Sequence, residues 1–139
     1  MFELHPHLVK DTVPLGRFTL SQFLLMNDSR YPWFLLVPER ENIREVYELD
    51  DADRRQLWEE SAQLSRTLTE LFKPDKLNIA SLGNQVPQLH VHHIVRYHHD
   101  HAWPAPVWGK LPPKPYYSAE LCKLKSLLIN KMQKVLRPD

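Results

Sequence analysis

The sequence predicts one domain, spanning all 139 residues, that combines β-strands with α-helices. Two apolar runs, 17–26 and 33–37, are separated by a short polar turn and predict an antiparallel hairpin. Residues 50–73 carry leucines at helical spacing and predict one long amphipathic helix. Two further strand-like segments, 76–82 and 88–97, follow the helix and are linked by a turn. The length is sufficient for a single domain with a substantial buried core.

Composition and charge are those of an ordinary globular protein. Because the formal net charge is +1, the chain has no overall attraction to nucleic acid or membrane surfaces, and we expect no stable nucleic-acid partner. Cys122 is the only cysteine, so an intrachain disulfide is excluded and a reducing compartment fits. No signal peptide is recognisable, and no apolar stretch approaches the roughly 18 residues of a membrane span. These features predict a soluble, cytoplasmic protein.

The first third of the chain supplies the predicted hairpin. Residues 1–16 are expected to form a loose helical turn and then a turn into the first strand, with the two early histidines in a surface loop. Residues 17–26 become continuously apolar, as a strand entering a sheet does. Residues 27–30 provide the turn, and residues 33–37 form the second strand, which Pro38 closes.

The long helix has clear boundaries in the sequence. Asp50 is suited to cap its N-terminus, and Pro74 stops it. One face should pack on the sheet, and it carries Leu57, Ser61, Leu64, Leu68 and Leu71. The solvent-exposed face is expected to hold the charged residues Arg54, Arg55, Glu59 and Glu60.

The segment 88–97 is the most informative part of the chain, because six of the eight histidines lie between positions 90 and 101. In a strand, side chains alternate between two faces. One face is nearly all apolar and should meet the core; it comprises Leu89, Val91, His93, Val95 and Tyr97. The other face comprises Gln88, His90, His92, Ile94 and Arg96. We place the chemistry on this polar face and expect His93 to be a satisfied buried histidine.

The last part of the chain predicts a loop and a helix. Residues 98–117 are rich in proline and tryptophan, and loops of this length in small domains are commonly functional or cover a partner. Trp103 and Trp108 can stack on a base or pack the loop onto the body. Ser118 is expected to cap a final helix, 118–137, whose apolar side is formed by Leu121, Leu124, Leu128, Met132 and Val135.

Two imidazoles at a spacing of two can bind a metal, perform covalent or acid–base chemistry, or lie in a polar patch. A metal site at His90 and His92 would need completion by His98, His99 or His101, with Asp100 as the only nearby carboxylate. For covalent chemistry, a neutral imidazole attacks phosphorus and is afterwards a good leaving group. The phosphate oxygens then need hydrogen-bond donors, which can come from Gln88, Asn78, Asn84 and backbone amides around Gly83.

The run Gly83-Asn84-Gln85-Val86-Pro87-Gln88-Leu89-His90-Val91-His92-His93-Ile94 resembles the signature of the histidine triad (HIT) superfamily. That signature is Gly-Gln-x-Val-x-His-φ-His-φ-His-φ-φ, where φ is apolar. The resemblance covers roughly residues 15–97, since the strands and the long helix come in the family's order. The tail at 104–109 is similar to that of a bacterial branch often labelled dinucleoside polyphosphate hydrolases. Two positions depart from the signature: Gln88 replaces the first histidine, and Asn84 replaces the glutamine after the glycine.

The resemblance implies an α+β fold, in which a five-stranded antiparallel sheet carries the long helix, and a homodimer. It implies that His90 is the nucleophile, that His92 contacts the phosphate and the leaving group, and that Gln88 orients the site. The implied phosphate-binding residues are Asn78, Asn84 and Gln85, and the implied ribose-binding residues are Asn27 or Asp28. No metal or other cofactor is needed for this route.

The predicted function is that of a nucleotide phosphohydrolase or nucleotidyltransferase. His90 would attack the α-phosphorus of a nucleoside phosphate or dinucleoside polyphosphate, and water would hydrolyse the resulting nucleotidyl-histidine. Because glutamine cannot carry a proton on and off, one alternative is a nucleotide-binding protein with little turnover. A second alternative is a metal-binding domain that uses the histidines between positions 90 and 101.

Overall fold

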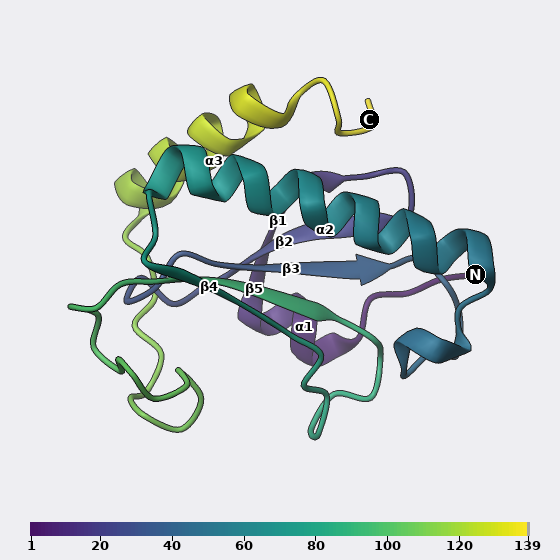
Figure 1. Ribbon diagram of the computed structural model, residues 1–139, viewed down its shortest axis with the longest axis horizontal. Helices are drawn as coiled ribbons and strands as arrows, with labels where there is room; N and C mark the ends of the chain where they lie inside the picture. The colour runs from purple at the N-terminus through teal and green to yellow at the C-terminus, as the bar shows by residue number, and fades with distance from the viewer. Residues whose placement is uncertain (139) are drawn as a thin grey trace.

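The computed structural model describes residues 1–138 and contains a five-stranded antiparallel sheet flanked by helices (Figure 1). The strand order is β1-β2-β3-β5-β4, and every neighbouring pair is antiparallel. The strands are β1 (Thr12–Arg17), β2 (Ser21–Met26), β3 (Trp33–Pro38), β4 (Lys76–Ala80) and β5 (Val91–Arg96). The predicted α+β class with five antiparallel strands is confirmed.

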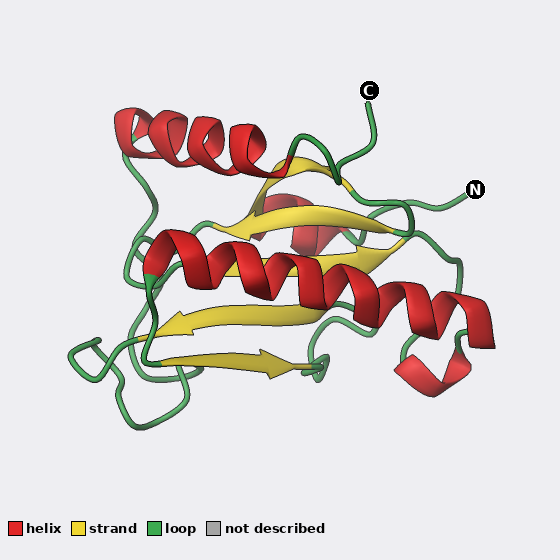
Figure 2. Cartoon of the chain, turned by 45° about the horizontal axis from the view of Figure 1, so that its top comes forward, coloured by secondary structure: helices red, strands yellow, loops and turns green. Residues whose placement is uncertain are grey.

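Helices lie on both faces of the sheet. Helices α2 (Asp51–Phe72) and α3 (Ser118–Met132) cover one face, and the short helix α1 (Pro6–Asp11) lies on the other (Figure 2). Each face has its own apolar cluster, so the sheet is buried on both sides. A short 3-10 turn, Val46–Glu48, precedes α2. Within residues 1–138, no helix has the length and apolar character needed to cross a membrane.

The predicted strand 17–26 is wrong, because the chain forms two strands there. β1 ends at Arg17, β2 begins at Ser21, and a tight turn joins them. β1 escaped prediction because Pro14 and Gly16 interrupt its apolar pattern. They are tolerated because β1 is an edge strand and because the register shifts at a bulge between these two residues.

Helix α2 has the predicted boundaries and a mostly correct inner face. The Asp50 carboxylate accepts the backbone N–H of Asp53 at 2.8 Å, as expected of an N-cap. The prediction that Glu60 faces solvent is wrong, since this side chain is fully buried. Its Oε2 accepts the backbone N–H of Leu20 and the Gln56 side chain, both at 2.8 Å. The carboxylate therefore satisfies a donor of the β1–β2 turn that has no strand partner.

Helix α3 packs on the same apolar cluster as α2, but its boundaries differ from the prediction. Ser118 is the first helical residue rather than the cap, and the N-cap is Tyr117. The Glu120 carboxylate accepts the Tyr117 backbone N–H at 3.2 Å, which secures the helix start. The helix ends at Met132 instead of residue 137. Its predicted apolar side is confirmed, since all five residues are buried or packed against the core: Leu121, Leu124, Leu128, Met132 and Val135.

Strand β5 shows the predicted alternation of side chains between the two faces. Val91 and Val95 belong to the cluster beneath α2 and α3, whereas Ile94 belongs to the cluster on the opposite face. His93 is fully buried; its Nε2 lies 2.7 Å from the Ser61 hydroxyl of α2, and its Nδ1 lies 3.1 Å from the Val91 carbonyl. The prediction of a satisfied buried histidine is therefore confirmed.

Candidate active site

The two candidate histidines open onto a cavity of about 330 Å³ on the face of the sheet that carries α1. His92 lies in β5, whereas His90 precedes it, because the strand begins at Val91 and not at residue 88 as predicted. The walls come from α1, the end of β2, the loop after β4 and the segment around Trp108. The lining residues are Leu8, Asp11, Met26, Leu82, Asn84, Gln85, Val86, His90, His92, Trp108 and Gly109.

His90 is held in one orientation by the backbone. Its Nδ1 lies 2.7 Å from the carbonyl oxygen of Gln88. Because a carbonyl can only accept, Nδ1 carries the proton and Nε2 is left with a free lone pair. Burial lowers the pKa of His90, although the carbonyls of Gln88 and Leu82 act in the opposite direction. The ring is thus a neutral imidazole with an available nitrogen.

His92 is the closest aromatic neighbour of His90, and the two ring centroids lie 4.8 Å apart in an edge-on arrangement. Trp33 of β3 donates its indole N–H to His92 Nδ1 at 2.9 Å. The other nitrogen, Nε2, is buried and has no hydrogen-bond partner among residues 1–138. Burial, and then the neighbouring His90, lower the pKa of His92 to about 3. No local motif distinguishes Trp33, whose position in an apolar run predicts only a strand residue packed in the core.

The two tryptophans of the long loop have different surroundings. Trp108 lines the cavity and stands edge-on to His92, with ring centroids 5.0 Å apart. Trp103 instead lies against the guanidinium of Arg96, whose Cζ is 5.5 Å from the ring centroid. Only Trp108 is therefore placed to meet a ligand in this cavity, whereas Trp103 packs the loop onto the body.

The loop between β4 and β5 closes tightly over His90. Asn84 and Gln85, two of the predicted phosphate-binding residues, line the cavity. Gly83 permits the close approach, because a Cβ there would lie 2.7 Å from the carbonyl oxygen of Val86 and 3.7 Å from His90 Cε1. The position therefore requires glycine for steric reasons.

Three other predicted binding residues have their oxygens engaged elsewhere. Asn78 accepts a hydrogen bond from Arg96 at 2.8 Å and does not line the cavity. Asn27 and Asp28 anchor the segment before α3: Asn27 accepts the backbone N–H of Tyr116 at 3.0 Å, and Asp28 accepts that of Lys114 at 3.3 Å. The carboxylate that does line the cavity is Asp11, at the end of α1. It was not predicted, because nothing in the local sequence distinguishes it from other exposed acidic residues.

Gln88 takes a different role from the one predicted for its side chain. Its amide donates to the carbonyl of Glu3 and accepts the backbone N–H of His5, both at 2.9 Å. The side chain thus holds the N-terminal segment, and only the backbone carbonyl of Gln88 contacts His90. Gln88 also precedes β5, so the row of polar side chains predicted on one strand is shorter than expected.

The histidines proposed to complete a metal site are not gathered there. His98, His99 and His101 are exposed, and their rings contact Trp103, Tyr97 and Tyr31, respectively. Across the part of the chain that the structure describes, no group of three His, Cys, Asp or Glu residues is placed to hold a metal ion.

Together, the fold and the paired, buried imidazoles define a small α+β domain that presents histidines from one sheet face to a cavity. A family model described as the HIT domain matches residues 7–99. The chain therefore belongs to the HIT domain family, whose members generally act on nucleotides.

Solved structures agree with this assignment. A histidine triad protein from Marinobacter aquaeolei VT8 is 50% identical to this chain, with a TM-score of 0.94 over 97% of this chain and 98% of that one. Histidine triad proteins from Bradyrhizobium japonicum and Sinorhizobium meliloti 1021 are 46% and 39% identical. Both have a TM-score of 0.91 and cover 94% of this chain and 97% of their own. A search of curated proteins found no match.

Proposed function

We propose that the protein is a nucleotide hydrolase or nucleotidyltransferase in which His90 attacks the α-phosphorus of a nucleoside phosphate or dinucleoside polyphosphate. The observation that carries this proposal is the contact between His90 Nδ1 and the Gln88 carbonyl, which leaves Nε2 unprotonated at the cavity. Membership of a family that acts on nucleotides supports the substrate class. A buried, neutral imidazole is an effective nucleophile toward phosphorus.

The reaction balances in two steps. His90 Nε2 forms a bond to phosphorus while the bond between phosphorus and the leaving oxygen breaks, and the electron pair departs with a phosphate or polyphosphate anion. The ring then carries a positive charge, which the Gln88 carbonyl stabilises by accepting the Nδ1 proton in a hydrogen bond. Water next attacks phosphorus, the N–P bond breaks with its electron pair returning to Nε2, and the proton of the water passes to solvent.

The remaining site residues receive roles from their positions. We propose that Asn84, Gln85 and His92 bind phosphoryl oxygens, since all three line the cavity. We propose that Asp11, which lines the same cavity, accepts hydrogen bonds from the ribose hydroxyls. Asn27 and Asp28, which the resemblance suggested for the ribose, would then act by anchoring the segment that leads to α3.

Position 88 is proposed to correspond to the first histidine of the family's triad, replaced here by glutamine. In this role Gln88 orients the nucleophile through its backbone carbonyl rather than through its amide. The absence of a titratable group at this position favours substrates whose leaving group departs as a stable anion, as in dinucleoside polyphosphates.

The direct test is His90→Asn, assayed with labelled nucleoside phosphates, dinucleoside polyphosphates and nucleoside phosphoramidates. Removing a covalent nucleophile should reduce turnover by about three orders of magnitude or more, whereas nucleotide binding should persist. The wild-type protein should also retain label in an acid-labile N–P linkage. His99→Asn is the matched control, because His99 is exposed and stacks only on Tyr97. Turnover by His90→Asn near the wild-type rate would rule out the covalent mechanism.

We further propose that the protein forms a homodimer through β4. This strand lies at the edge of the sheet and exposes Ile79, which is 45% accessible. Edge strands pair readily with a second chain. Sedimentation should show a dimer for the wild-type protein and a monomer for Ile79→Lys, whereas Val9→Lys on α1 should remain dimeric. A monomeric wild-type protein would contradict this proposal.

A further inference from the structure

We propose that Trp33 is a positioning residue that holds His92 as a neutral hydrogen-bond donor to the bound phosphoryl group. This inference rests on the proposed function for the identity of the ligand. The state of the His92 ring itself follows from contacts within the protein, so it can be tested without turnover.

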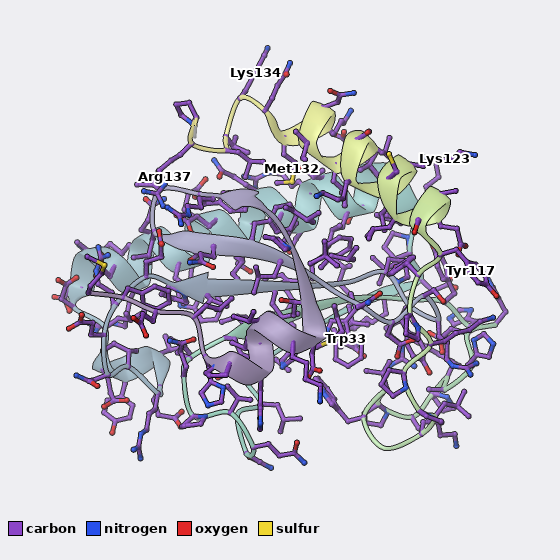
Figure 3. The ribbon with its side chains drawn as sticks, turned by 180° about the vertical axis from the view of Figure 1, so that it is seen from behind. Trp33, Tyr117, Lys123, Met132, Lys134 and Arg137 are labelled. Carbon is purple, nitrogen blue, oxygen red and sulfur yellow. The ribbon has the colours of Figure 1, made fainter. Side chains whose placement is uncertain are left out.

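The register of the sheet brings the two side chains together. In the β3–β5 ladder, Leu35 pairs with His92 and Trp33 pairs with Ile94. Trp33 is therefore the diagonal neighbour of His92 on the same face, within reach of a large aromatic side chain. Trp33 is 7% exposed and packs with its indole against the rings of Trp108 and Tyr31. Figure 3 shows it on the side of the sheet where α1 lies.

The chemistry of the indole decides which His92 nitrogen carries the proton. An indole N–H can only donate, and it lies 2.9 Å from His92 Nδ1. Nδ1 must therefore carry the lone pair, and the proton of the neutral ring must be on Nε2. The opposite tautomer, like the imidazolium, would direct two N–H groups at each other across this contact. Trp33 thus disfavours both of these states.

The remaining nitrogen is a donor without a partner in the protein. His92 Nε2 is buried and makes no hydrogen bond within residues 1–138, although the Leu82 carbonyl lies close enough to affect the pKa of the ring. His92 lines the same cavity as His90. A buried donor without an acceptor is costly, which favours a ligand that supplies one. The oxygens of a phosphoryl group are strong acceptors of this kind.

His90 and His92 are consequently fixed in opposite states. The Gln88 carbonyl places the proton of His90 on Nδ1, and the Trp33 indole places the proton of His92 on Nε2. At the cavity, the first ring presents a lone pair and the second presents an N–H. One ring can attack phosphorus while the other binds an oxygen of the same phosphoryl group.

The surroundings of His92 also keep it uncharged. Burial, and then His90 and His93, lower its pKa to about 3 against an opposing effect of the Leu82 carbonyl. The only carboxylate among the cavity-lining residues is Asp11 on α1, and the aromatic neighbours Trp33 and Trp108 carry no charge. His92 therefore acts as a fixed dipole, and it does not deliver a proton to the leaving group.

The test is nitrogen-detected NMR of the histidine rings in the intact protein between about pH 5 and 8, the range in which a free imidazole titrates. The His92 signals are assigned by their loss in His92→Gln. We expect Nε2 to be protonated and Nδ1 to be unprotonated throughout this range. Detection of Nδ1–H or of the imidazolium at neutral pH would overturn the inference.

Two variants isolate the indole N–H. Trp33→Phe keeps an aromatic ring but removes the donor, so both tautomers should be populated and the pKa of His92 should rise from its wild-type value. Trp108→Phe is the control, because Trp108 stands edge-on to His92 without a hydrogen bond between them. It should leave the tautomer unchanged. If Trp33→Phe fails to fold, 3-benzothienylalanine at position 33, with sulfur in place of the N–H, provides the same comparison.

Turnover supplies an independent measurement. Trp33→Phe should lower kcat about tenfold or more with a smaller change in KM, because the wrong tautomer cannot donate at the cavity. Its pH–rate profile should gain an inflection that the wild-type profile lacks. An unchanged His92 tautomer and an unchanged profile would contradict the role of Trp33. If instead the tautomers respond as expected but His90→Asn retains full turnover, the proposed reaction fails and the Trp33 contact stands.

Discussion

At the scale of single residues, Gln88 links the N-terminal segment to the proposed nucleophile. Its side-chain amide donates a hydrogen bond to the Glu3 carbonyl and accepts one from the His5 backbone N–H. Its backbone carbonyl accepts a hydrogen bond from His90 Nδ1. Alanine would remove both side-chain contacts. Histidine would place its two ring nitrogens in a different geometry from the amide it replaces. The side chain is thus suited to positioning backbone rather than to proton transfer.

We therefore expect Gln88→Ala and Gln88→His to loosen the N-terminal segment. The loss of these hydrogen bonds should lower the free energy of unfolding by about 1–2 kcal/mol, measured by denaturant titration. Hydrogen exchange at the His5 amide should accelerate in both variants, because its acceptor is removed or displaced. Gln88→Glu keeps an acceptor for His5 but loses the donor to Glu3, so it should give a smaller acceleration. Unchanged protection of the His5 amide would show that this contact is absent in solution.

Local spacing in the sequence predicted four of the residues that line the cavity. His90 and His92 occupy the expected face, and Asn84 and Gln85 lie beside them. Trp33 could not be found in this way, because its contact joins residues 59 positions apart and depends on the register of two strands. That register is not encoded in any short motif.

At the scale of elements, the irregular loop after β5 is ordered by a buried ion pair. Arg96 Nε and Nη2 donate to the Asp100 carboxylate at 2.8 and 3.1 Å, and neither side chain is more than 5% exposed. Asp100 also accepts the backbone N–H groups of Tyr97, Ala102 and Trp103. Burial raises the pKa of Asp100, but the bonds from Arg96 and the backbone outweigh it and lower the pKa to about 2. This cluster fixes the path of the loop that leads to the cavity.

Asp100→Ala should consequently be strongly destabilising. The Arg96 guanidinium would remain buried without its counter-charge, and such losses typically reach about 3–5 kcal/mol. Limited proteolysis should cut within residues 98–117, and nucleotide binding should weaken as Trp108 loses its position. Glu59→Ala is the control, because Glu59 is exposed on α2 and forms an ion pair with the exposed Arg66 side chain at 3.7 Å. Equal stability of the two variants would contradict the anchoring role.

Elements with local signals were predicted more accurately than elements that depend on distant contacts. The capped helix α2 begins and ends where the sequence indicated. β1 was missed, because only its pairing with β2 compensates for its proline and glycine. The burial of Glu60 could not be predicted either, because its hydrogen-bond donor, the Leu20 backbone N–H, lies 40 positions away in the turn between β1 and β2. A charged side chain is normally exposed to solvent. It can be buried when a donor from a distant part of the chain forms a hydrogen bond with it and offsets the cost of desolvation.

At the scale of the whole molecule, β5 lies between two apolar layers and contributes a buried histidine to each. His92 faces the cavity side, and the adjacent His93 faces α2. Burial lowers the pKa of His92 to about 3 and that of His93 to about 4, against an ordinary value of 6.5. Both rings are therefore neutral in the folded protein under conditions in which the unfolded chain would bind protons.

This difference predicts acid destabilisation in a defined window. Because the folded-state pKa values lie below the unfolded value, the contribution to stability is fully present above about pH 6.5. It declines as the pH falls toward about 4 for His93 and about 3 for His92. Each histidine adds a slope of about 1.4 kcal/mol per pH unit within the window. Denaturant titrations at several pH values should show this decline, and His93→Gln should reduce the slope. Stability that stays constant between about pH 7 and 5 would contradict the neutral, buried state of these rings.

Trp33 and Trp108 both lie beside His92, so their fluorescence can report on the cavity. The two indoles lie with ring centroids 5.7 and 5.0 Å from the His92 ring. Indole emission responds to the polarity of its surroundings, so a ligand that displaces water beside Trp108 should shift the emission of the unlabelled protein. The other two tryptophans, Trp58 and Trp103, are not among the ring neighbours of His92 in residues 1–138 and contribute background. Replacing them with phenylalanine would confine the signal to the cavity, so that ligand binding could be followed directly by fluorescence.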